Sequence, residues 1–321
     1  PDAGLSLRDR LATGMAMAAG KATAHRLDPL LKPRSVAIVG ASGTEGSFGD
    51  NLLNSIGGWR YGGAVWPVNP KYGCLRGRAC YPSLSELPGV PDLAVMAVAD
   101  ARVEAAMEAA AKAGAKAAVL FGRLYEAPSD RLPMTARIAA LAREAGMAVC
   151  GVNCMGFMNA VEGLKVVGIP PPYDQPAPTA ERRGIALLSH SGGTWSAFLC
   201  SNRDLRFSLA VSVGQELVTG IADYLDFLVE QPETGAIGLV LETLREPEAV
   251  AAALDRAAAR GIPVAAVKLG RSESAKRLAL AHSGALSGSA EAYGAFFRRH
   301  GAAHCRTLDE LADTLQLFVL A

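Results

Sequence analysis

Short apolar runs alternate with amphipathic stretches along the first half of the chain. The runs are continuously apolar, which predicts strands buried on both faces, at Ser35–Val39, Ala64–Val68, Leu93–Val98, Lys116–Phe121 and Met147–Cys150. The stretches between them predict helices at Asp50–Ile56, Val103–Ala113 and Leu132–Ala145. Strands that alternate with helices are typical of a parallel sheet with helices on both sides. We therefore predict one doubly wound α/β domain over residues 29–160.

The same alternation resumes in the second half and predicts a second open α/β domain over residues 184–321. Its predicted strands are Ile185–Leu188, Ser208–Val213, Ile237–Leu241 and Val264–Leu269. Its predicted helices are Thr194–Ser201, Ile221–Glu230, Pro247–Arg260, Ala290–His300 and Leu308–Leu317. The proline-rich residues 161–183 predict a linker. Residues 1–28 predict an appended helical extension, because the segment from Leu5 to Leu27 is rich in Ala and Met.

Composition narrows the class of protein. The 321 residues suffice for two domains, and a net charge of +1 argues against a broad nucleic-acid surface. The six cysteines lack the spacing of metal ligands, so we expect reduced thiols and no metal site. No apolar run reaches the roughly 18 residues of a membrane span, and no signal-peptide pattern opens the chain. We expect a soluble, cytoplasmic protein that binds neither nucleic acid nor membrane.

A glycine-rich turn comes directly after the first predicted strand and before a predicted helix. Its candidate residues are Gly40, Ser42, Gly43, Thr44, Glu45 and Gly46. Small residues let the backbone approach a phosphate, and the N-terminus of the helix supplies N–H donors. The glycines are spaced by three, so this is not the GxGxxG pattern of dinucleotide dehydrogenases. The turn predicts a phosphate site, and a tight turn without a ligand is the alternative.

Two more loops fall on the same edge of the predicted sheet. The second strand runs into Asn69 and Lys71, with no Asp or Glu to hold a ribose 2′-hydroxyl. A lysine there suits a phosphorylated ribose, as in CoA or NADP. Asn153 follows the fifth strand, where it either hydrogen-bonds a ligand or caps its own loop.

The second domain opens with another strand, small-residue turn and helix. The turn comprises Ser189, His190, Ser191, Gly192 and Gly193 and predicts a second anion site. It is not a GxSxG nucleophile elbow, because Ser189 occupies the position of the first glycine. His190 is a candidate base, although a structural or substrate-lining role is favoured for one residue in a Ser-rich turn.

His282 lies among small residues in the stretch Leu278–Ser289. An imidazole titrates near neutrality, so it can act as a nucleophile or a base. A surface histidine without function is the alternative. Glu242 ends the predicted strand Ile237–Leu241, where a carboxylate can orient an imidazole. An ordinary acid before a helix explains Glu242 equally well.

Taken in order, these motifs resemble the NDP-forming acyl-CoA synthetases, the superfamily of succinyl-CoA synthetase α subunits and ADP-forming acetyl-CoA synthetases. The resemblance covers about residue 27 to the end. It is carried by Leu27–Ser42, Val68–Lys71, Tyr81–Ser83, Ser189–Gly192, Ser212–Gly214 and Ala281–Ser289. It implies a Rossmann-like CoA-binding domain followed by a flavodoxin-like CoA-ligase domain, both with mostly parallel sheets.

The resemblance also implies roles for the candidate residues. His282 would be phosphorylated and carry phosphate between an acyl phosphate and a nucleotide, while Glu242 holds its imidazole. The phosphate and acyl site would comprise Ser189, His190, Ser191, Gly192, Gly193, Gln215, Glu216, Ser283 and Gly284. The first glycine turn, Asn69, Lys71 and Asn153 would hold CoA. The implied reaction converts an acid, CoA and ATP into acyl-CoA, ADP and phosphate.

The chain departs from the family pattern at Val152, His190, Glu216 and Ser283, which we interpret as signs of a divergent substrate. No segment resembles the ATP-grasp domain that the family uses to bind ATP or ADP with Mg. We therefore expect the chain to need an ATP-grasp domain, on a partner subunit or a fused segment, and to assemble into an oligomer.

Two other functions stay open. The chain could be a non-catalytic CoA-binding regulatory module, because it departs from the pattern and lacks a nucleotide domain. Lys71 and the first glycine turn also suit an NADP-dependent oxidoreductase, although no acid/base set of a dehydrogenase is visible.

Overall fold

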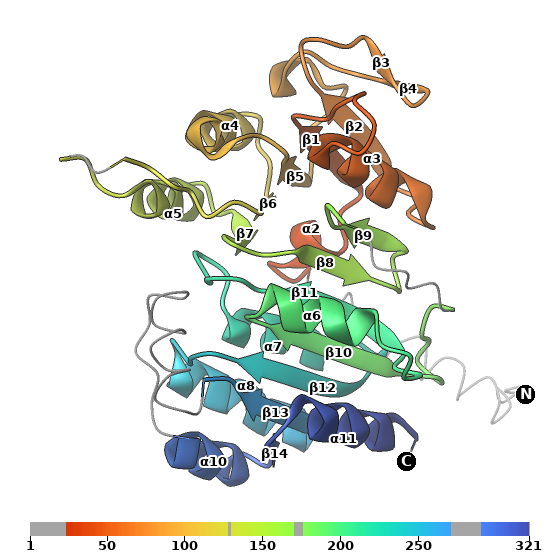
Figure 1. Ribbon diagram of the computed structural model, residues 1–321, viewed down its shortest axis with the longest axis vertical. Helices are drawn as coiled ribbons and strands as arrows, with labels where there is room; N and C mark the ends of the chain where they lie inside the picture. The colour runs from red at the N-terminus through yellow and green to blue at the C-terminus, as the bar shows by residue number, and fades with distance from the viewer. Residues whose placement is uncertain (1–23, 128–129, 170–175, 271–289, 321) are drawn as a thin grey trace, which may run out of the picture.

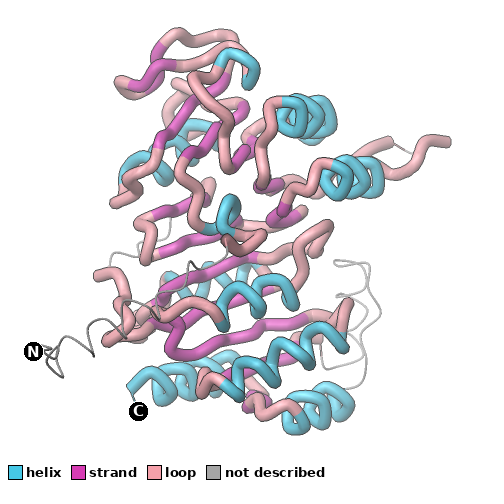
Figure 2. Tube along the Cα trace, turned by 180° about the vertical axis from the view of Figure 1, so that it is seen from behind, coloured by secondary structure: helices cyan, strands magenta, loops and turns pink. Residues whose placement is uncertain are grey.

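The computed structural model describes residues 24–127, 130–169, 176–270 and 290–320 (Figure 1). Two α/β domains are stacked along the long axis of the molecule, as both views show (Figures 1 and 2). His282, Ser283 and Gly284 lie outside the described residues, as does most of the predicted N-terminal helix. The family roles of these three residues therefore stay predictions.

The first domain has a five-stranded sheet in the order β2-β1-β5-β6-β7, and all its neighbouring strands are parallel. The strands are β1 (Ser35–Val39), β2 (Ala64–Val68), β5 (Leu93–Met96), β6 (Ala117–Leu120) and β7 (Ala148–Gly151). Helix α3 (Phe48–Gly58) packs on one face, and α4 (Val103–Lys112) and α5 (Met134–Glu144) pack on the other. A small hairpin follows β2, and two 3₁₀ turns precede α4; these are β3 (Cys74–Leu75), β4 (Arg78–Ala79), η1 (Leu84–Glu86) and η2 (Asp100–Arg102).

The second domain has a seven-stranded sheet in the order β14-β13-β12-β10-β11-β8-β9. Its strands are β8 (Gly156–Asn159), β9 (Leu164–Val166), β10 (Gly184–Ser189), β11 (Phe207–Ser212), β12 (Thr234–Leu241), β13 (Val264–Lys268) and β14 (Ala303–Cys305). Helices α7 (Ile221–Val229), α8 (Pro247–Ala259) and α10 (Ala290–Arg299) cover one face. Helices α6 (Gly192–Leu199) and α11 (Leu308–Leu320) cover the other. The two sheets confirm the predicted α/β class with mostly parallel strands.

The predicted linker needs correction in its first part. Strands β8 and β9 form an antiparallel pair, and β8 pairs with β11, so residues 156–166 belong to the second sheet. The first part of the predicted linker 161–183 is therefore not a connecting segment, because it contains β9. The prediction was wrong here because the alternation of strand and helix does not reveal a short antiparallel pair added at a sheet edge.

The chain that precedes β1 is part of the core. Helix α2 (Asp28–Leu31) lies between the two sheets (Figure 1), and Leu27, Leu30 and Leu31 are completely buried. The Leu31 carbonyl accepts a hydrogen bond of 2.9 Å from the Asn159 side chain on β8. Residues 24–27, included in the predicted helix, are not helical.

One apolar cluster runs through both domains. It includes Val119 and Cys150 of the first sheet together with Phe157, Leu188 and Leu239 of the second. The domains therefore share buried surface instead of being joined only by chain connections. Among the described helices, none combines the length and the apolar character that crossing a bilayer requires.

Candidate functional site

The first glycine turn is held tightly against α3. A Cβ on Gly49, in the first turn of α3, would lie 2.4 Å from the Gly40 carbonyl oxygen, so only glycine fits there. Gly40 itself has φ +91° and would place a Cβ 2.5 Å from the Ala97 carbonyl oxygen. At Gly46, by contrast, a Cβ would meet no atom within 4 Å. The turn therefore has open space beside Gly46, two residues before α3, which suits the approach of a phosphate.

Asp50 fixes the end of this turn, and the sequence analysis missed it. Its carboxylate accepts the Gly46 N–H at 3.1 Å and pairs with the Arg76 guanidinium at 2.7 Å. The Asp50 side chain is only 3 % exposed, and Arg76 reaches it from the β3–β4 hairpin. Ser47 caps α3 by accepting the Asp50 N–H. The signal that could have found this pair is an acid in the first turn of a helix that follows a glycine turn.

The loop after β2 lies against the glycine turn. The Asn69 side chain donates to the Ala41 carbonyl at 2.8 Å and accepts the Lys71 N–H at 3.0 Å. Lys71 is exposed on this loop. The Tyr72 ring packs over Gly43, and hydrogen bonding with Ser42, with the Gly43 backbone and with Thr44 lowers the pKa of its hydroxyl. The structure thus brings the predicted residues of these two loops together and adds Tyr72.

The loop after β7 joins the first domain to the second. The Val152 carbonyl in this loop accepts the Gln215 N–H at 2.9 Å, and the carbonyl of Gly151, the last residue of β7, accepts the Leu217 N–H at 3.0 Å. Asn153 has φ +53° and accepts a hydrogen bond from Arg123 at 3.2 Å. The carboxyl ends of β7 and β11 therefore meet directly, which places Asn153 and Gln215 on neighbouring loops.

The turn after β10 adjoins the same junction. Ser191 caps α6 by accepting the Thr194 N–H at 3.2 Å, and the buried Ser189 hydroxyl donates to the Ser191 carbonyl at 2.8 Å. A Cβ on Gly192 would lie 2.7 Å from Met155 Cγ, so glycine lets the first-domain loop approach the start of α6. The first N–H groups of a helix have no partner within the helix, which suits an anion, and the anion site expected at this turn stays a prediction.

His190 and Glu216 form a buried pair that sequence reasoning did not connect. His190 is 3 % exposed and Glu216 is 5 % exposed, and Nε2 of the imidazole lies 3.4 Å from a carboxylate oxygen. The same oxygen lies 3.3 Å from Arg245 Nε, and the other accepts the Ile221 N–H at 2.7 Å. Burial raises the pKa of the Glu216 carboxyl, but the imidazole, the Ile221 N–H and Arg245 together outweigh it and lower the pKa below its ordinary value.

Glu242 is tied to this pair through its backbone. Its N–H donates to His190 Nδ1 at 3.0 Å, directly after the last residue of β12. Nδ1 therefore accepts this hydrogen bond, and the ring proton is carried by Nε2. The Glu242 side chain is half-buried at the same edge of the sheet.

Lys268, the last residue of β13, is a further buried cation at this edge. It is 2 % exposed, and its Nζ lies 5.2 Å from the centre of the Tyr293 ring. The Tyr293 hydroxyl accepts the Leu244 N–H at 3.0 Å, and burial raises the pKa of that hydroxyl. Sequence analysis missed both residues, because a lysine inside a buried strand carries no motif.

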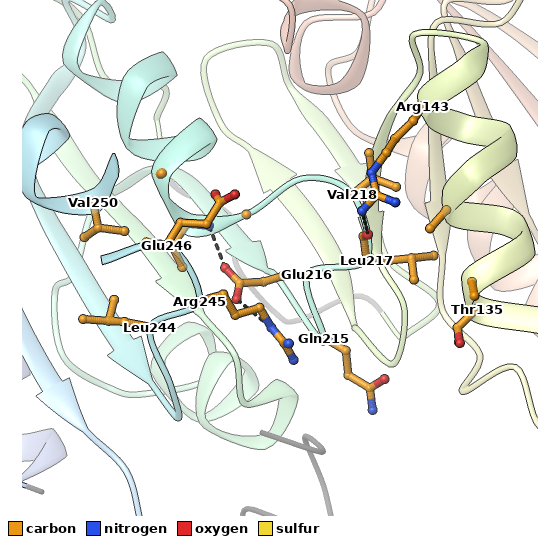
Figure 3. A pocket seen from close by; sticks show the side chains of 15 residues that line it. Thr135, Arg143, Gln215, Glu216, Leu217, Val218, Leu244, Arg245, Glu246 and Val250 are labelled. Atoms are coloured by element: carbon orange, nitrogen blue, oxygen red, sulfur yellow. Dashed lines mark hydrogen bonds and ion pairs between the residues drawn. The ribbon is translucent and has the colours of Figure 1, made fainter. Parts of the chain in front are cut away.

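A cavity of about 560 Å³ opens between the two domains beside Glu216. Helix α5 forms one wall, and the start of α7 and the loop after β12 form the other. In Figure 3, Glu216 faces Arg245, and Arg143 of α5 lies beside the Leu217 backbone, to whose carbonyl it donates a hydrogen bond. Charged side chains, Arg143, Glu216, Arg245 and Glu246, line this cavity together with apolar residues, so it can fix the orientation of a polar small molecule.

Comparison with known families assigns both domains. Residues 34–160 match the CoA binding domain, and residues 182–318 match the succinyl-CoA ligase like flavodoxin domain. The chain belongs to the NDP-forming acyl-CoA synthetase family. Both matches agree with the resemblance carried by the sequence motifs, and their order along the chain is the order of the two sheets.

Individual relatives agree with this family. A trans-feruloyl-CoA synthase from an unknown prokaryotic organism is 33% identical over 294 residues, which cover 91% of this chain and 42% of that protein. The α subunit of the ADP-forming acetate–CoA ligase II of Pyrococcus furiosus is 28% identical, with 91% of this chain and 62% of the subunit covered. The chain thus spans between about two fifths and three fifths of these relatives.

A solved structure gives the same result for the fold. The dinucleotide forming acetyl-coenzyme A synthetase 1 of Ca. Korarchaeum cryptofilum, in complex with phosphate and ADP, superposes with a TM-score of 0.82 at 27% identity. The match covers 91% of this chain and 62% of that one. Both domains of this acyl-CoA synthetase-like chain therefore share their arrangement with a structure of the family.

Proposed function

We propose that this chain is the CoA-binding and phosphoryl-carrying part of an ADP-forming acyl-CoA synthetase. The observation that supports it most directly is the junction of the two domains, where the Val152 carbonyl accepts the Gln215 N–H. A CoA molecule held by the first domain would then have its thiol end beside the anion site of the second.

The first domain suits an extended ligand such as CoA. The open backbone at Gly46, with Ser42, Asn69 and Lys71 beside it, would hold phosphate groups. Strand β1 is three strands from β7 in the sheet, which corresponds to about 14 Å at the usual strand spacing. A ligand that reaches from the glycine turn to Asn153 must therefore lie across the ends of β5 and β6.

The second domain would perform the phosphoryl transfer. The turn from Ser189 to Gly193 would hold the phosphoryl group, and Glu242 would orient the imidazole of His282. Bound CoA supplies the thiol that displaces phosphate from an acyl phosphate and gives acyl-CoA. In the complete reaction an ATP-grasp domain, on a partner or fused segment, would bind ATP with Mg and phosphorylate His282.

The reverse half-reaction tests this proposal without a nucleotide domain. Phosphate displaces CoA from an acyl-CoA to give an acyl phosphate, whose phosphoryl group passes to His282 with release of the carboxylate. We expect the chain to take up label from ³²P-phosphate in the presence of acetyl-CoA or feruloyl-CoA, the acyl groups named for its relatives. The label should be lost in acid and retained in base, as expected of phosphohistidine.

Two variants make the test specific. His282→Ala should abolish labelling, whereas His300→Ala should retain it, because His300 follows α10 and contacts Asp255 and Phe296 of the second domain, away from the predicted anion site. Label that persists in His282→Ala would refute the phosphohistidine. Binding of CoA without any label, even with an ATP-grasp subunit present, would favour a regulatory module. Preference for NADPH over CoA would favour an oxidoreductase.

A further inference from the structure

His190 holds a defined tautomer between two elements of the second domain. Its Nδ1 accepts the Glu242 N–H, so the proton of the neutral ring is carried by Nε2. Nε2 lies 3.4 Å from a Glu216 carboxylate oxygen, a close contact in which these two atoms do not reach hydrogen-bond geometry. The ring therefore links the end of β12 to the loop after β11 by its two different nitrogens.

Glu216 continues the connection to a third element. Its other oxygen accepts the N–H of Ile221, the first residue of α7, at 2.7 Å. Glu216 has φ +52°, a left-handed conformation that is uncommon outside glycine. This conformation costs conformational free energy and directs the side chain toward the interior. Arg245 closes the pair on the side of the cavity (Figure 3).

Burial makes this arrangement a support rather than a binding surface. Each side chain of the pair is at least 95 % buried, so neither can contact a ligand with more than an edge. A buried pair of this kind costs more to break on one side than on both, because a single replacement leaves a polar group without a partner. The two positions, 26 apart in the chain, are therefore coupled.

We propose that His190 and Glu216 form one positioning unit, which fixes the backbone of Glu242 through Nδ1 and the start of α7 through the carboxylate. The consequence for phosphoryl transfer rests on the proposed function, since it depends on Glu242 orienting His282. The structural part of the proposal does not depend on any activity.

Two substitutions separate the two arms of the imidazole. His190→Asn keeps an acceptor close to the place of Nδ1 and removes the donor that faces Glu216. His190→Gln can keep a donor close to the place of Nε2 and removes the acceptor for Glu242. Both replace one uncharged polar side chain by another, so each serves as the control for the other.

Hydrogen exchange resolved to single amides measures the positioning in the full chain. We expect His190→Gln to speed exchange of the Glu242 amide about tenfold and leave the Ile221 amide unchanged. His190→Asn should leave Glu242 unchanged and speed exchange at Ile221, because Glu216 loses a partner. Equal changes in both variants, or no change in either, would overturn the proposal. Glu216→Gln gives an independent variant in which the Ile221 amide should respond most and the Glu242 amide should also respond, because the His190 ring loses the carboxylate beside its Nε2.

The labelling reaction gives the catalytic readout. We expect His190→Gln to lower the rate of label uptake about tenfold with the CoA concentration dependence unchanged, and His190→Asn to restore most of the rate. If the wild-type chain takes up no label but the exchange pattern holds, the proposed function fails and the positioning unit stands. If label uptake is equal in both variants, the proposed effect on Glu242 is refuted.

Discussion

Glu216 keeps its charge in a nearly closed environment because one carboxylate oxygen accepts the Ile221 N–H and the other lies 3.3 Å from Arg245 Nε and 3.4 Å from His190 Nε2. Burial alone would raise its pKa, but His190, the Ile221 N–H and Arg245 lower it. The sequence shows Glu216 only as a charged residue in a loop after Gly214 and Gln215, and we therefore expected its carboxylate to lie near a ligand. The partners that bury and neutralise it come from the ends of three other elements, and such contacts have no local signature.

Replacing Glu216 by Gln should destabilise the protein by about 1–3 kcal/mol at pH 7, since charged hydrogen bonds are lost in a buried site. The folded-state pKa is lower than the unfolded one, so the stability from the carboxylate is complete above the unfolded pKa of about 4.3 and is lost as pH falls through the folded value. The difference between wild type and variant should therefore shrink below about pH 4. Denaturant unfolding from pH 7 to pH 3.5 measures it.

The control for Glu216 is Glu230→Gln. Glu230 pairs with Arg260 at 2.8 Å, but both side chains are about half exposed. Such a pair contributes little, so we expect a change within about 0.5 kcal/mol. A Glu216→Gln difference that stays constant over the whole pH range would contradict a carboxylate with a lowered pKa.

At the scale of elements, the periodic apolar pattern predicted nine strands and eight helices of the described residues to within about three residues at each end. It failed where an element is too short to carry a period, as at β8, β9 and β14. The pattern also located the glycine-rich turns, but it did not identify the side chains that hold them in place. Asp50 reaches Arg76 across a hairpin, and Tyr72 packs over Gly43, because the sheet order brings β1 and β2 side by side.

Helix α3 offers a test of how closely its first turn must pack. Gly49→Ala places a methyl group 2.4 Å from the Gly40 carbonyl, so we expect a loss of about 1–3 kcal/mol and weaker binding of CoA. Gly58→Ala, at the other end of the same helix, meets no atom within 4 Å and should be neutral or stabilise by about 0.4–1 kcal/mol. Urea unfolding midpoints check both, and a loss of equal size in the two variants would refute the packing argument.

At the scale of the whole molecule, the two domains are joined by hydrogen bonds as well as by a shared apolar cluster. Asn159 of β8 bonds the Leu31 carbonyl, and Val152 bonds Gln215. The sequence predicts two domains because each has its own series of strands, yet it cannot show that they pack into one body. The packing of the two domains depends on the place of β8 and β9 in the second sheet. This place is set by the pairing of β8 with β11, which the residues of β8 and β9 alone do not show.

Thr219 makes a single side-chain hydrogen bond between the two domains, and this bond can be removed by one substitution. It is completely buried, and its hydroxyl accepts the N–H of Val149 on β7 at 2.9 Å. Since β7 is the outermost strand of the first sheet, Thr219 satisfies a backbone group that no neighbouring strand can reach. Thr219→Val keeps the shape of the side chain and leaves the Val149 N–H without a partner. We therefore expect a loss of about 1–3 kcal/mol in the free energy of unfolding and faster hydrogen exchange at the Val149 amide.

The control is Thr219→Ser, which retains the hydroxyl and should keep the slow exchange at Val149, although it loses a methyl group. Because the apolar cluster spans both sheets, unfolding of Thr219→Val should remain a single transition at a lower denaturant concentration. Equal exchange rates at Val149 in the Val and Ser variants would show that the hydroxyl does not hold the two domains together.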